Sequence, residues 1–435
     1  MKISISSYSG MGAWFSLRLA AEGHDVDFLL SEPKYEDVLK GLIKPPLIQD
    51  IDQRRHILGY GFPDYEKYDL SLFDLTGRAK QADHSKMLTP TLGDGTLEHM
   101  LEDDREFGIK SMEECGINVP PYTKFNTPSE AKGFIKSSNK RYVFKPFTIG
   151  GTTQDTATTY VSKSAEDLLE FIDTLWESAK KAPFILQEFI AGQEIGTEAF
   201  FNGTDFFLIS GTLEEKKFMN DNKGPNTGCS GNLIFAMSGE EKIYKEGLLK
   251  AAPFLRSSGF RGIIDLNTIV TEDKVYGLEW TPRFGYLCCP TIATMYGFGY
   301  GTLLFDIASG NSPEIKWNHR YGAGVTITVP PYPTEIRLPK AKGIPIEGID
   351  PQNLKALTET YLFDAMVEKK KLVTSGNYGY IGAVLSGSNS IEAAFAGCDR
   401  KLEEIQIPNC QYRTDVEEST TKRYNQLMEW GWITP

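Results

Sequence analysis

The pattern of hydrophobic and polar residues at the start of the chain predicts a parallel sheet covered by helices. Residues 2–7 read as a short strand, a glycine-containing turn follows, and residues 13–24 (AWFSLRLAAEGH) read as a helix that ends near Gly23. A second strand, DVDFLLS, comes directly afterwards, and LSLFDL adds another further on. A strand–turn–helix–strand order is the first unit of a doubly wound α/β sheet.

After about residue 99 the pattern predicts more irregular alternation of strands and helices. The run LEDDREFGIKSMEECG predicts one charged helix that ends at Gly116, and AEDLLEFIDTLWESAKK predicts an amphipathic helix. Strands are predicted at RYVFKPF, TTYVS, PFILQEFI and GTEAFFNG. Residues 205–330 continue the alternation, and residues 323–410 are rich in strand patterns before a C-terminal helix. We expect the whole chain to be folded, because no repeat or flexible linker interrupts these patterns.

Composition narrows the class of protein. The 435 residues are 40% hydrophobic and 24% charged, as in soluble globular proteins of several domains. The net charge of −12 disfavours nucleic acid as a partner. No apolar run approaches the roughly 18 residues of a membrane span, and the first residues lack the apolar core of a signal peptide. The six cysteines contain no C-x-x-C pair and the five histidines no metal spacing. We therefore expect a cytoplasmic protein with reduced thiols and without a membrane partner.

One stretch is unusually rich in turn-forming residues. Lys223 to Gly231 (KGPNTGCSG) contains three glycines, a proline and an asparagine between two strand patterns, FFLISGTLEEKKF and GNLIFAM. A hairpin needs only two to five such residues. By itself the stretch is explained by a surface connection. Its length and composition also suit a functional loop, and we predict a loop that contacts a ligand.

A second stretch carries groups that suit phosphate. Lys145 ends the RYVFKPF strand and precedes a turn that contains Gly150 and Gly151. An ammonium group and several backbone N–H groups can together bind phosphate oxygens. Alone the signal is weak, since lysines at strand ends are usually solvated. The earlier turn SGMG could also hold a phosphate at a helix N-terminus, although it lacks the full G-x-G-x-x-G pattern.

Acidic and amide side chains follow at spacings that suit a nucleotide and its metal. In LQEFIAGQEIGTEAF a strand carries Gln187 and Glu188, and a turn places Glu194 at its exit, where a carboxylate could bind both ribose hydroxyls. Further on, RGIIDLNTIVTEDKVYGLEW predicts a hairpin with Asp265 on one strand and Glu279 on the other. Facing carboxylates are an arrangement for Mg²⁺ with nucleotide phosphates, although an exposed hairpin face explains such a pair equally well.

The order of these parts resembles the ATP-grasp superfamily, and most closely the glycinamide ribonucleotide synthetase (phosphoribosylamine–glycine ligase) family. The GPNTG stretch and the E-W-T-P-R-F-G strand carry the resemblance, which covers nearly the whole chain. It implies an α/β protein with a Rossmann-like pre-ATP-grasp domain at 1–98 and an ATP-grasp domain at 99–325, whose mobile lobe lies at about 126–200. A small β-rich domain would follow at 326–435. Residues 148–155 would close over the phosphates.

The resemblance also implies roles for individual residues. The ATP phosphates would be bound by Arg105, Lys145, Lys216 and the Gly150–Gly151 turn, adenine by Gln187, Glu188, Phe189 and Ile190, and ribose by Glu194. Metal ligands would be Asp265, Glu279 and Thr281. The substrate would contact Pro225, Asn226, Thr227, Gly228 and Arg283, and the catalytic residues would be Lys145, Lys217 and Arg283.

The implied reaction is ATP-dependent amide formation. With Mg²⁺ (or Mn²⁺), ATP would phosphorylate a carboxylate, and an amine would then attack the acyl phosphate. The substrates would be an amino acid such as glycine and an amine, phosphoribosylamine in the family's own purine-biosynthesis reaction. A monomer or a homodimer is expected.

Several departures from the family leave alternatives open. Thr281 replaces an asparagine metal ligand, and Cys229 and Ser230 follow Gly228 in place of a second glycine and a methionine. The turn that helps the family bind the phosphoribosyl group is here SGMGAWF, without a positive charge. Either another basic residue such as Arg18 or Arg283 supplies that charge, or the amine differs.

Two other functions therefore remain open. One is a related ligase that joins an amino acid to a different amine or nucleotide. The other is a nucleotide-binding regulatory protein without turnover. Cys288 and Cys289 follow the R-F-G motif, but we expect them to be buried hydrophobic residues rather than nucleophiles.

Overall fold

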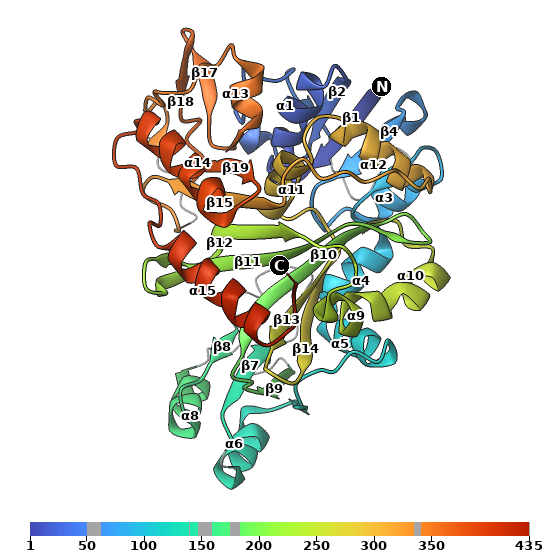
Figure 1. Ribbon diagram of the computed structural model, residues 1–435, viewed down its shortest axis with the longest axis vertical. Helices are drawn as coiled ribbons and strands as arrows, with labels where there is room; N and C mark the ends of the chain where they lie inside the picture. Colours follow the sequence, from blue (N-terminus) through green and yellow to red (C-terminus); the bar gives the residue numbers. More distant parts are fainter. Residues whose placement is uncertain (50–61, 139, 147–158, 175–182, 335–340, 435) are drawn as a thin grey trace.

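The described elements of the chain build three larger sheets and one two-stranded sheet (Figure 1). The structure is a computed structural model, and it describes residues 1–49, 62–138, 140–146, 159–174, 183–334 and 341–434. The expected phosphate turn at Gly150 and Gly151, and the expected lid at 148–155, lie outside these residues.

The N-terminal sheet is parallel and has the predicted α/β form. Its order is β3-β2-β1-β4-β5, and every neighbouring pair in the described residues is parallel. The strands are β1 (Lys2–Ser7), β2 (Asp25–Leu30), β3 (Leu47–Ile48), β4 (Leu70–Phe73) and β5 (Thr91–Leu92), with helices α1 (Ala13–Ala21) and α3 (Ala79–Lys86) and the short turns η1 (Pro33–Tyr35) and η2 (Tyr65–Lys67). Strands β1 and β4 are almost wholly buried, which explains their nearly continuous apolar character.

The predicted charged helix after residue 100 is two helices. They are α4 (Thr96–Asp103) and α5 (Arg105–Glu114), and Asp104 separates them. The Asp104 carboxylate accepts a hydrogen bond from the backbone N–H of Phe107 at 3.0 Å, so it caps the second helix. The break matters because it places Arg105 at the first turn of α5.

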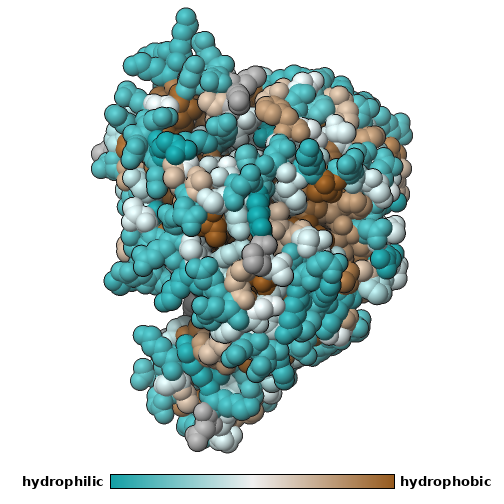
Figure 2. Space-filling model, in the orientation of Figure 1, coloured by the Kyte–Doolittle hydropathy of each residue, from teal (hydrophilic) through white to brown (hydrophobic). Residues whose placement is uncertain are grey.

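A small lobe projects from the rest of the molecule, at the bottom of Figure 1. Its sheet has the order β6-β9-β7-β8 and has its own hydrophobic core. The elements are β6 (Tyr122–Phe125), β7 (Tyr142–Pro146), β8 (Tyr160–Val161), β9 (Phe184–Glu188), α6 (Pro128–Ser137) and α8 (Ala165–Thr174). Hydrophilic side chains cover most of this lobe in Figure 2.

The largest sheet is formed by eight strands that follow Gln193 in the chain. Its order is β14-β13-β10-β11-β12-β15-β19-β16. The strands are β10 (Gln193–Phe201), β11 (Phe206–Met219), β12 (Lys223–Ala236), β13 (Gly262–Val270), β14 (Val275–Thr281), β15 (Tyr321–Thr328), β16 (Thr360–Leu362) and β19 (Tyr380–Ser388). Strand β15 pairs with β12 on one side and β19 on the other. The chain position expected to separate the last two domains, between 325 and 326, therefore lies inside a strand of this sheet.

Helices cover this sheet and complete one continuous hydrophobic core with the N-terminal domain. They are α9 (Lys242–Glu246), η4 (Leu248–Ala251), α10 (Ala252–Ser258), α11 (Cys288–Tyr296), α12 (Tyr300–Ser309), α13 (Leu354–Thr358), α14 (Ile391–Glu404) and α15 (Val416–Glu429), and β17 (Met366–Glu368) with β18 (Lys371–Val373) forms a small hairpin. No helix in the described part of the chain is both long and apolar enough to span a membrane.

The glycine-rich stretch at 223–231 is a strand, so the prediction of a long loop is wrong. Asp221 and Asn222 both have positive φ, 59° and 53°, and they reverse the chain within a tight turn. The whole stretch is then available to pair with β11, and Asn226 lies opposite Lys217. Two register shifts in β11 interrupt this ladder. Aspartate and asparagine tolerate the left-handed conformation, so the turn signal lies just before the glycines.

Candidate active site

Most of the sequence-predicted residues meet in one cleft of about 630 Å³. Strands β7 and β9 of the small lobe line one side, and β10 to β14 of the large sheet line the other. The predicted residues that line it are Arg105, Lys145, Gln187, Glu188, Phe189, Ile190, Glu194, Lys216, Asn226, Thr227, Gly228, Asp265, Glu279, Thr281 and Arg283. Residues that are far apart in the sequence thus converge on one site.

Two predicted residues do not line the cleft. Lys217 follows Lys216 on β11, and Pro225 precedes Asn226 on β12. On β11, Lys216 and Lys217 alternate between the two faces of the sheet, whereas on β12 the consecutive residues Asn226, Thr227 and Gly228 all line the cleft beside the register shifts. The neighbours Lys216 and Asn226 line the cleft, and Lys217 and Pro225 do not.

Strand alternation builds the floor of the cleft. The polar side chains of the lining recur at every second position, namely Glu194 and Glu198 around Gly196 on β10, Thr212, Glu214 and Lys216 on β11, Asp265 and Asn267 on β13, and Glu279 and Thr281 on β14. Sequence reasoning missed Glu198, Thr212, Glu214 and Asn267. They could have been predicted from strand alternation, because each lies two or four residues along the same strand from Glu194, Lys216 or Asp265.

Cationic side chains gather between the small lobe and the large sheet. Lys145 is only 7% exposed, and its burial, followed by the nearby Arg105, lowers the pKa of its ammonium group to about 8. Arg105 donates from Nε to the backbone oxygen of Pro146 at 3.1 Å, which ties α5 to the end of β7. Burial alone would lower the pKa of Lys216, but Glu194 and Glu214 raise it above its usual range. Bound phosphate oxygens would stabilise all of these charges.

The predicted adenine segment has few free backbone donors. The N–H of Glu188 donates to Pro121 at 2.7 Å, and that of Phe189 donates to Arg141 at 2.9 Å. Gln187 lies on β9 between β6 and β7, is 2% exposed, and has no hydrogen-bond partner for Nε2 among the described residues. The Gln187 amide is therefore a donor at this end of the cleft that a ligand could satisfy.

The predicted metal ligands share one face of the β13–β14 hairpin. Asp265 lies opposite Thr281, and Asn267 lies opposite Glu279, so the two carboxylates are diagonal neighbours rather than directly facing. Asp265 Oδ1 and Asn267 Oδ1 are buried, and neither has a hydrogen-bond partner in the described part of the chain. Burial, followed by the charge of Glu214, raises the pKa of Asp265 to about 8. Unsatisfied oxygens beside a carboxylate fit a hard cation such as Mg²⁺.

Arg283 lies at the other end of the cleft. Its Nε donates to Glu102 Oε1 at 3.0 Å, and its guanidinium lies 5.2 Å from the ring centroid of Tyr286. Burial alone would lower the pKa of Arg283, whereas Glu102 raises it. The guanidinium is therefore a fixed positive charge, and ion pairing with Glu102 holds it in place.

The two adjacent cysteines donate to carboxylates instead of acting as exposed nucleophiles. Cys288 Sγ donates to Glu214 Oε1 at 3.3 Å, and Cys289 Sγ donates to Glu198 Oε1 at 3.8 Å. Burial raises the pKa of both thiols well above the usual value, so neither is a thiolate near neutral pH. Cys288 lines the cleft, and Cys289 is buried beside it.

The C-terminal helix also reaches the cleft, which the sequence did not predict. Arg423 of α15 donates from Nη2 to the backbone oxygen of Glu214 at 2.8 Å and to Glu215 Oε1 at 2.7 Å. Arg413 forms an ion pair with the same Glu215 carboxylate at 3.0 Å, and both of these residues are almost fully buried. The cluster anchors β11, which carries Glu214 and Lys216, to the end of the chain.

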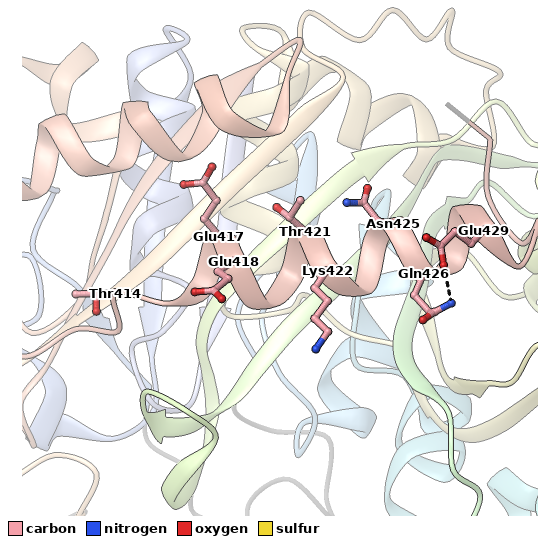
Figure 3. Close-up of a pocket in the computed structure, with 8 residues that line it drawn as sticks. All are labelled: Thr414, Glu417, Glu418, Thr421, Lys422, Asn425, Gln426 and Glu429. Carbon is pink, nitrogen blue, oxygen red and sulfur yellow. Dashed lines mark hydrogen bonds between the residues drawn. The ribbon is translucent and has the colours of Figure 1, made fainter.

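The outer face of α15 has a shallow concavity of its own (Figure 3). Its lining residues are Thr414, Glu417, Glu418, Thr421, Lys422, Asn425, Gln426 and Glu429. They come from one helix and the residues just before it, and Glu418, Lys422 and Glu429 are exposed. A single solvated helix face brings no groups from different elements together, so we assign no chemistry to it.

Comparison with known proteins places the cleft in a familiar fold. Residues 103–289 match the family model described as phosphoribosylglycinamide synthetase, ATP-grasp (A) domain. The phosphoribosylamine–glycine ligase of Streptococcus pneumoniae is 25% identical over 342 residues, which are 74% of this chain and 76% of that protein.

Solved structures agree over nearly the whole chain. The phosphoribosylamine–glycine ligase of Thermotoga maritima has a TM-score of 0.71 at 19% identity, covering 95% of this chain and 100% of the other. The L-amino acid ligase of Bacillus licheniformis has a TM-score of 0.59 at 17% identity, with 94% and 98% covered. These matches confirm the prediction of an α/β ATP-grasp fold, and the sequence matches confirm the resemblance to phosphoribosylamine–glycine ligase.

Proposed function

We propose that the cleft binds ATP with Mg²⁺ and joins the carboxylate of a small amino acid to an amine through an acyl phosphate. The observation that carries the proposal is the convergence of Lys145, Lys216 and Glu279 from three strands on one cleft. These residues lie within the segment that matches the ATP-grasp family model. Cations and carboxylates that meet between two sheets suit the transfer of a phosphoryl group, because cations bind the phosphates and carboxylates bind the metal ion.

ATP would lie between the small lobe and the large sheet. Lys145 and Arg105 would hold the phosphates from the lobe side, and Lys216 would hold them from the sheet. The unsatisfied Gln187 amide would donate to the base. Glu194, which lies in the same cleft, would accept hydrogen bonds from the ribose hydroxyls.

The metal would be held by Glu279 together with Asp265 and Asn267. In the described residues no three carboxylate, thiol or imidazole side chains are close enough to hold a metal by themselves. Mg²⁺ usually takes one or two carboxylates and completes its shell with phosphate oxygens and water. When bound, it would neutralise charge on the phosphates.

Arg283 would bind the substrate carboxylate and the acyl phosphate that forms from it. The guanidinium keeps its charge at every relevant pH and can bind two oxygens at once. Asn226, Thr227 and Gly228 would contact the amino acid from β12. Thr227 is already positioned, because its Oγ1 donates to the backbone oxygen of Lys216 at 3.0 Å.

A coupled assay for ADP tests the proposal. The purified full-length protein, supplied with ATP, Mg²⁺ and an amino acid such as glycine together with an amine, is expected to release ADP and phosphate. The same reaction without the amino acid is the background control. Calorimetric binding of ATP without ADP release for any pair of substrates would favour the regulatory alternative. Absence of ATP binding would overturn the assignment of the cleft.

A further inference from the structure

The N-terminus of α1, beside the cleft, is occupied by a carboxylate of the protein itself. Asp74 Oδ2 accepts a hydrogen bond from the backbone N–H of Gly12 at 2.7 Å and another from the hydroxyl of Ser7. The Ser7 oxygen in turn accepts from the N–H of Gly10 at 2.9 Å. Asp74 is 5% exposed. The N–H groups of Gly10 and Gly12, which this helix N-terminus would offer to an anion, are therefore already used.

There is no room for a second anion at this turn. A Cβ atom added at Gly12 would lie 2.8 Å from the Cβ of Asp74, so the carboxylate is packed directly against the backbone. The residues next to these groups in the sequence, Tyr8, Leu75 and Thr76, line the cleft. A phosphate carried by a substrate in the cleft would find the place at this turn already filled by the Asp74 carboxyl group.

The basic residues that could compensate are engaged elsewhere. Arg18 lies at the opposite end of α1, where it forms an ion pair with Glu22 at 3.0 Å. Arg283 is held by Glu102 and is already assigned to the amino acid carboxylate and the acyl phosphate that forms from it. Arg78 lies close to Asp74, and its Nη2 donates to the backbone oxygen of Ser7 at 2.9 Å, so it supports the occupied turn.

The neighbouring floor of the cleft is acidic. Glu198 and Glu214 line it, and neither has an ion-pair partner within the described residues. The Cys288 thiol donates to Glu214, and the Cys289 thiol donates to Glu198. Thr212, also in the lining, is 4% exposed, and its hydroxyl has no hydrogen-bond partner among the described residues. An ammonium group would supply the positive charge that these two buried carboxyl groups lack, and the Thr212 hydroxyl could accept a hydrogen bond from it, whereas a phosphate would supply no such charge.

We infer that the amine substrate carries no phosphate and enters the cleft as an ammonium ion held by Glu198 and Glu214. The inference rests on the proposed ligase function and names the class of its amine. Two separate parts of the site support it, namely the occupied turn at α1 and the acidic floor. It predicts a substrate different from the phosphoribosylamine used by the named relatives.

Isothermal titration calorimetry decides whether phosphate is excluded. The full-length protein, saturated with Mg²⁺ and ADP, is titrated with ribose 5-phosphate and with glycinamide ribonucleotide. We expect dissociation constants weaker than about 1 mM for both. Micromolar binding of either compound would overturn the inference and leave the ligase assignment intact. Failure to bind ADP at all would instead contradict the proposed function.

Asp74→Ala tests the cause of the exclusion. Emptying the turn frees the N–H of Gly12, and ribose 5-phosphate should then bind at least about tenfold more tightly than to the unmodified protein. Asp69→Ala is the control, because Asp69 lies at the other end of β4, is exposed and accepts a hydrogen bond from the N–H of Lys2. If Asp74→Ala does not fold, the titration of the unmodified protein still decides the inference.

Turnover with simple amines tests the ammonium site. Ammonia, ethanolamine and 1,4-diaminobutane are supplied with glycine and ATP, and ADP is measured beside a reaction with phosphoribosylamine. We expect turnover with at least one unphosphorylated amine, and a rise of about tenfold or more in its KM for Glu198→Gln with the KM for ATP unchanged. Turnover with phosphoribosylamine alone would overturn the inference. If no amine is turned over, the titration of the unmodified protein decides.

Discussion

Lys216 and Glu194 form an ion pair in the cleft, with 2.7 Å between Nζ and Oε1. Asn267 donates to the same carboxylate oxygen at 3.2 Å. Burial alone would raise the pKa of Glu194, but Lys216 holds it below its usual range. The residue proposed to bind ribose is therefore charged and oriented before the nucleotide arrives, and it also orients a proposed phosphate ligand.

This pairing predicts that Glu194→Ala affects nucleotide binding more than turnover. Ribose contacts are similar in the ground and transition states, so the KM for ATP should rise about tenfold while kcat changes by less than about threefold. Steady-state kinetics with varied ATP measure both constants. Asp173→Ala, on the exposed surface of the small lobe, is the control. A large loss of kcat with an unchanged KM would contradict the ribose assignment.

Lys145→Ala and Glu279→Ala should each reduce turnover at least about a hundredfold, or about 2.7 kcal/mol. The first change removes a phosphate-binding cation, and the second removes the only carboxylate proposed as a metal ligand on β14. The matched control for lysine is Lys136→Ala, which removes an exposed lysine from α6 of the same lobe. Activity close to the unmodified level in both variants would show that the reaction takes place elsewhere.

The lowered pKa of Lys145 predicts a pH dependence. Burial and Arg105 lower it to about 8, whereas Glu279 and Glu194 oppose the shift. Below this pH the ammonium group is charged and binds phosphate, and above it the charge is lost. The KM for ATP should rise roughly tenfold between pH 7 and pH 9, following the charged fraction of a group with this pKa. Lys145→Arg keeps its charge over this range, so a profile equally steep for that variant would refute the explanation.

The buried Arg413–Glu215–Arg423 cluster predicts a structural role for the C-terminal segment. Glu215→Ala would leave two arginines without their shared partner, and we expect a loss of about 3 kcal/mol in the free energy of unfolding. Urea denaturation measures it. Glu418→Ala, on the outer face of α15 in Figure 3, should change stability by less than about 0.5 kcal/mol. Equal stabilities for the two variants would argue against the anchoring role.

A substitution at Gly196 tests whether the position of Asp265 in the floor of the cleft matters for activity. A Cβ atom there would lie 2.6 Å from Asp265 Oδ1, so Gly196→Ala must displace that carboxylate. We expect kcat to fall about tenfold or more, because Asp265 is a proposed metal ligand. Gly133→Ala in α6 meets open space and should leave kcat unchanged. A measurement of Mg²⁺ dependence should show weaker activation in the Gly196 variant, and unchanged activation would count against Asp265 as a ligand.

The sequence by itself determined the fold class and the groups that form one side of the site. Glu194, Asp265 and Glu279 were identified from local patterns, and Lys216 from the family resemblance. Strand alternation explains why each of them shares a face of its strand with other polar residues of the cleft. The same rule explains Glu198, Glu214 and Asn267, which were not predicted because their motifs had no separate signal. The error at Lys223–Gly231 was also local. Asp221 and Asn222 reverse the chain before the glycines begin, so the stretch predicted as a loop is a strand.

Only the tertiary structure decided which charges are free. The sequence left Arg18 and Arg283 as possible phosphate ligands, but contacts with Glu22 and Glu102 engage both. The sequence showed that the turn before α1 contains no cation. It did not show that this turn is filled by the Asp74 carboxylate, which lies 62 residues further along the chain. It also gave no sign that Arg423 of the last helix would reach Glu214 and Glu215. Such pairings depend on long-range packing, because a charge finds its partner in space and not in sequence.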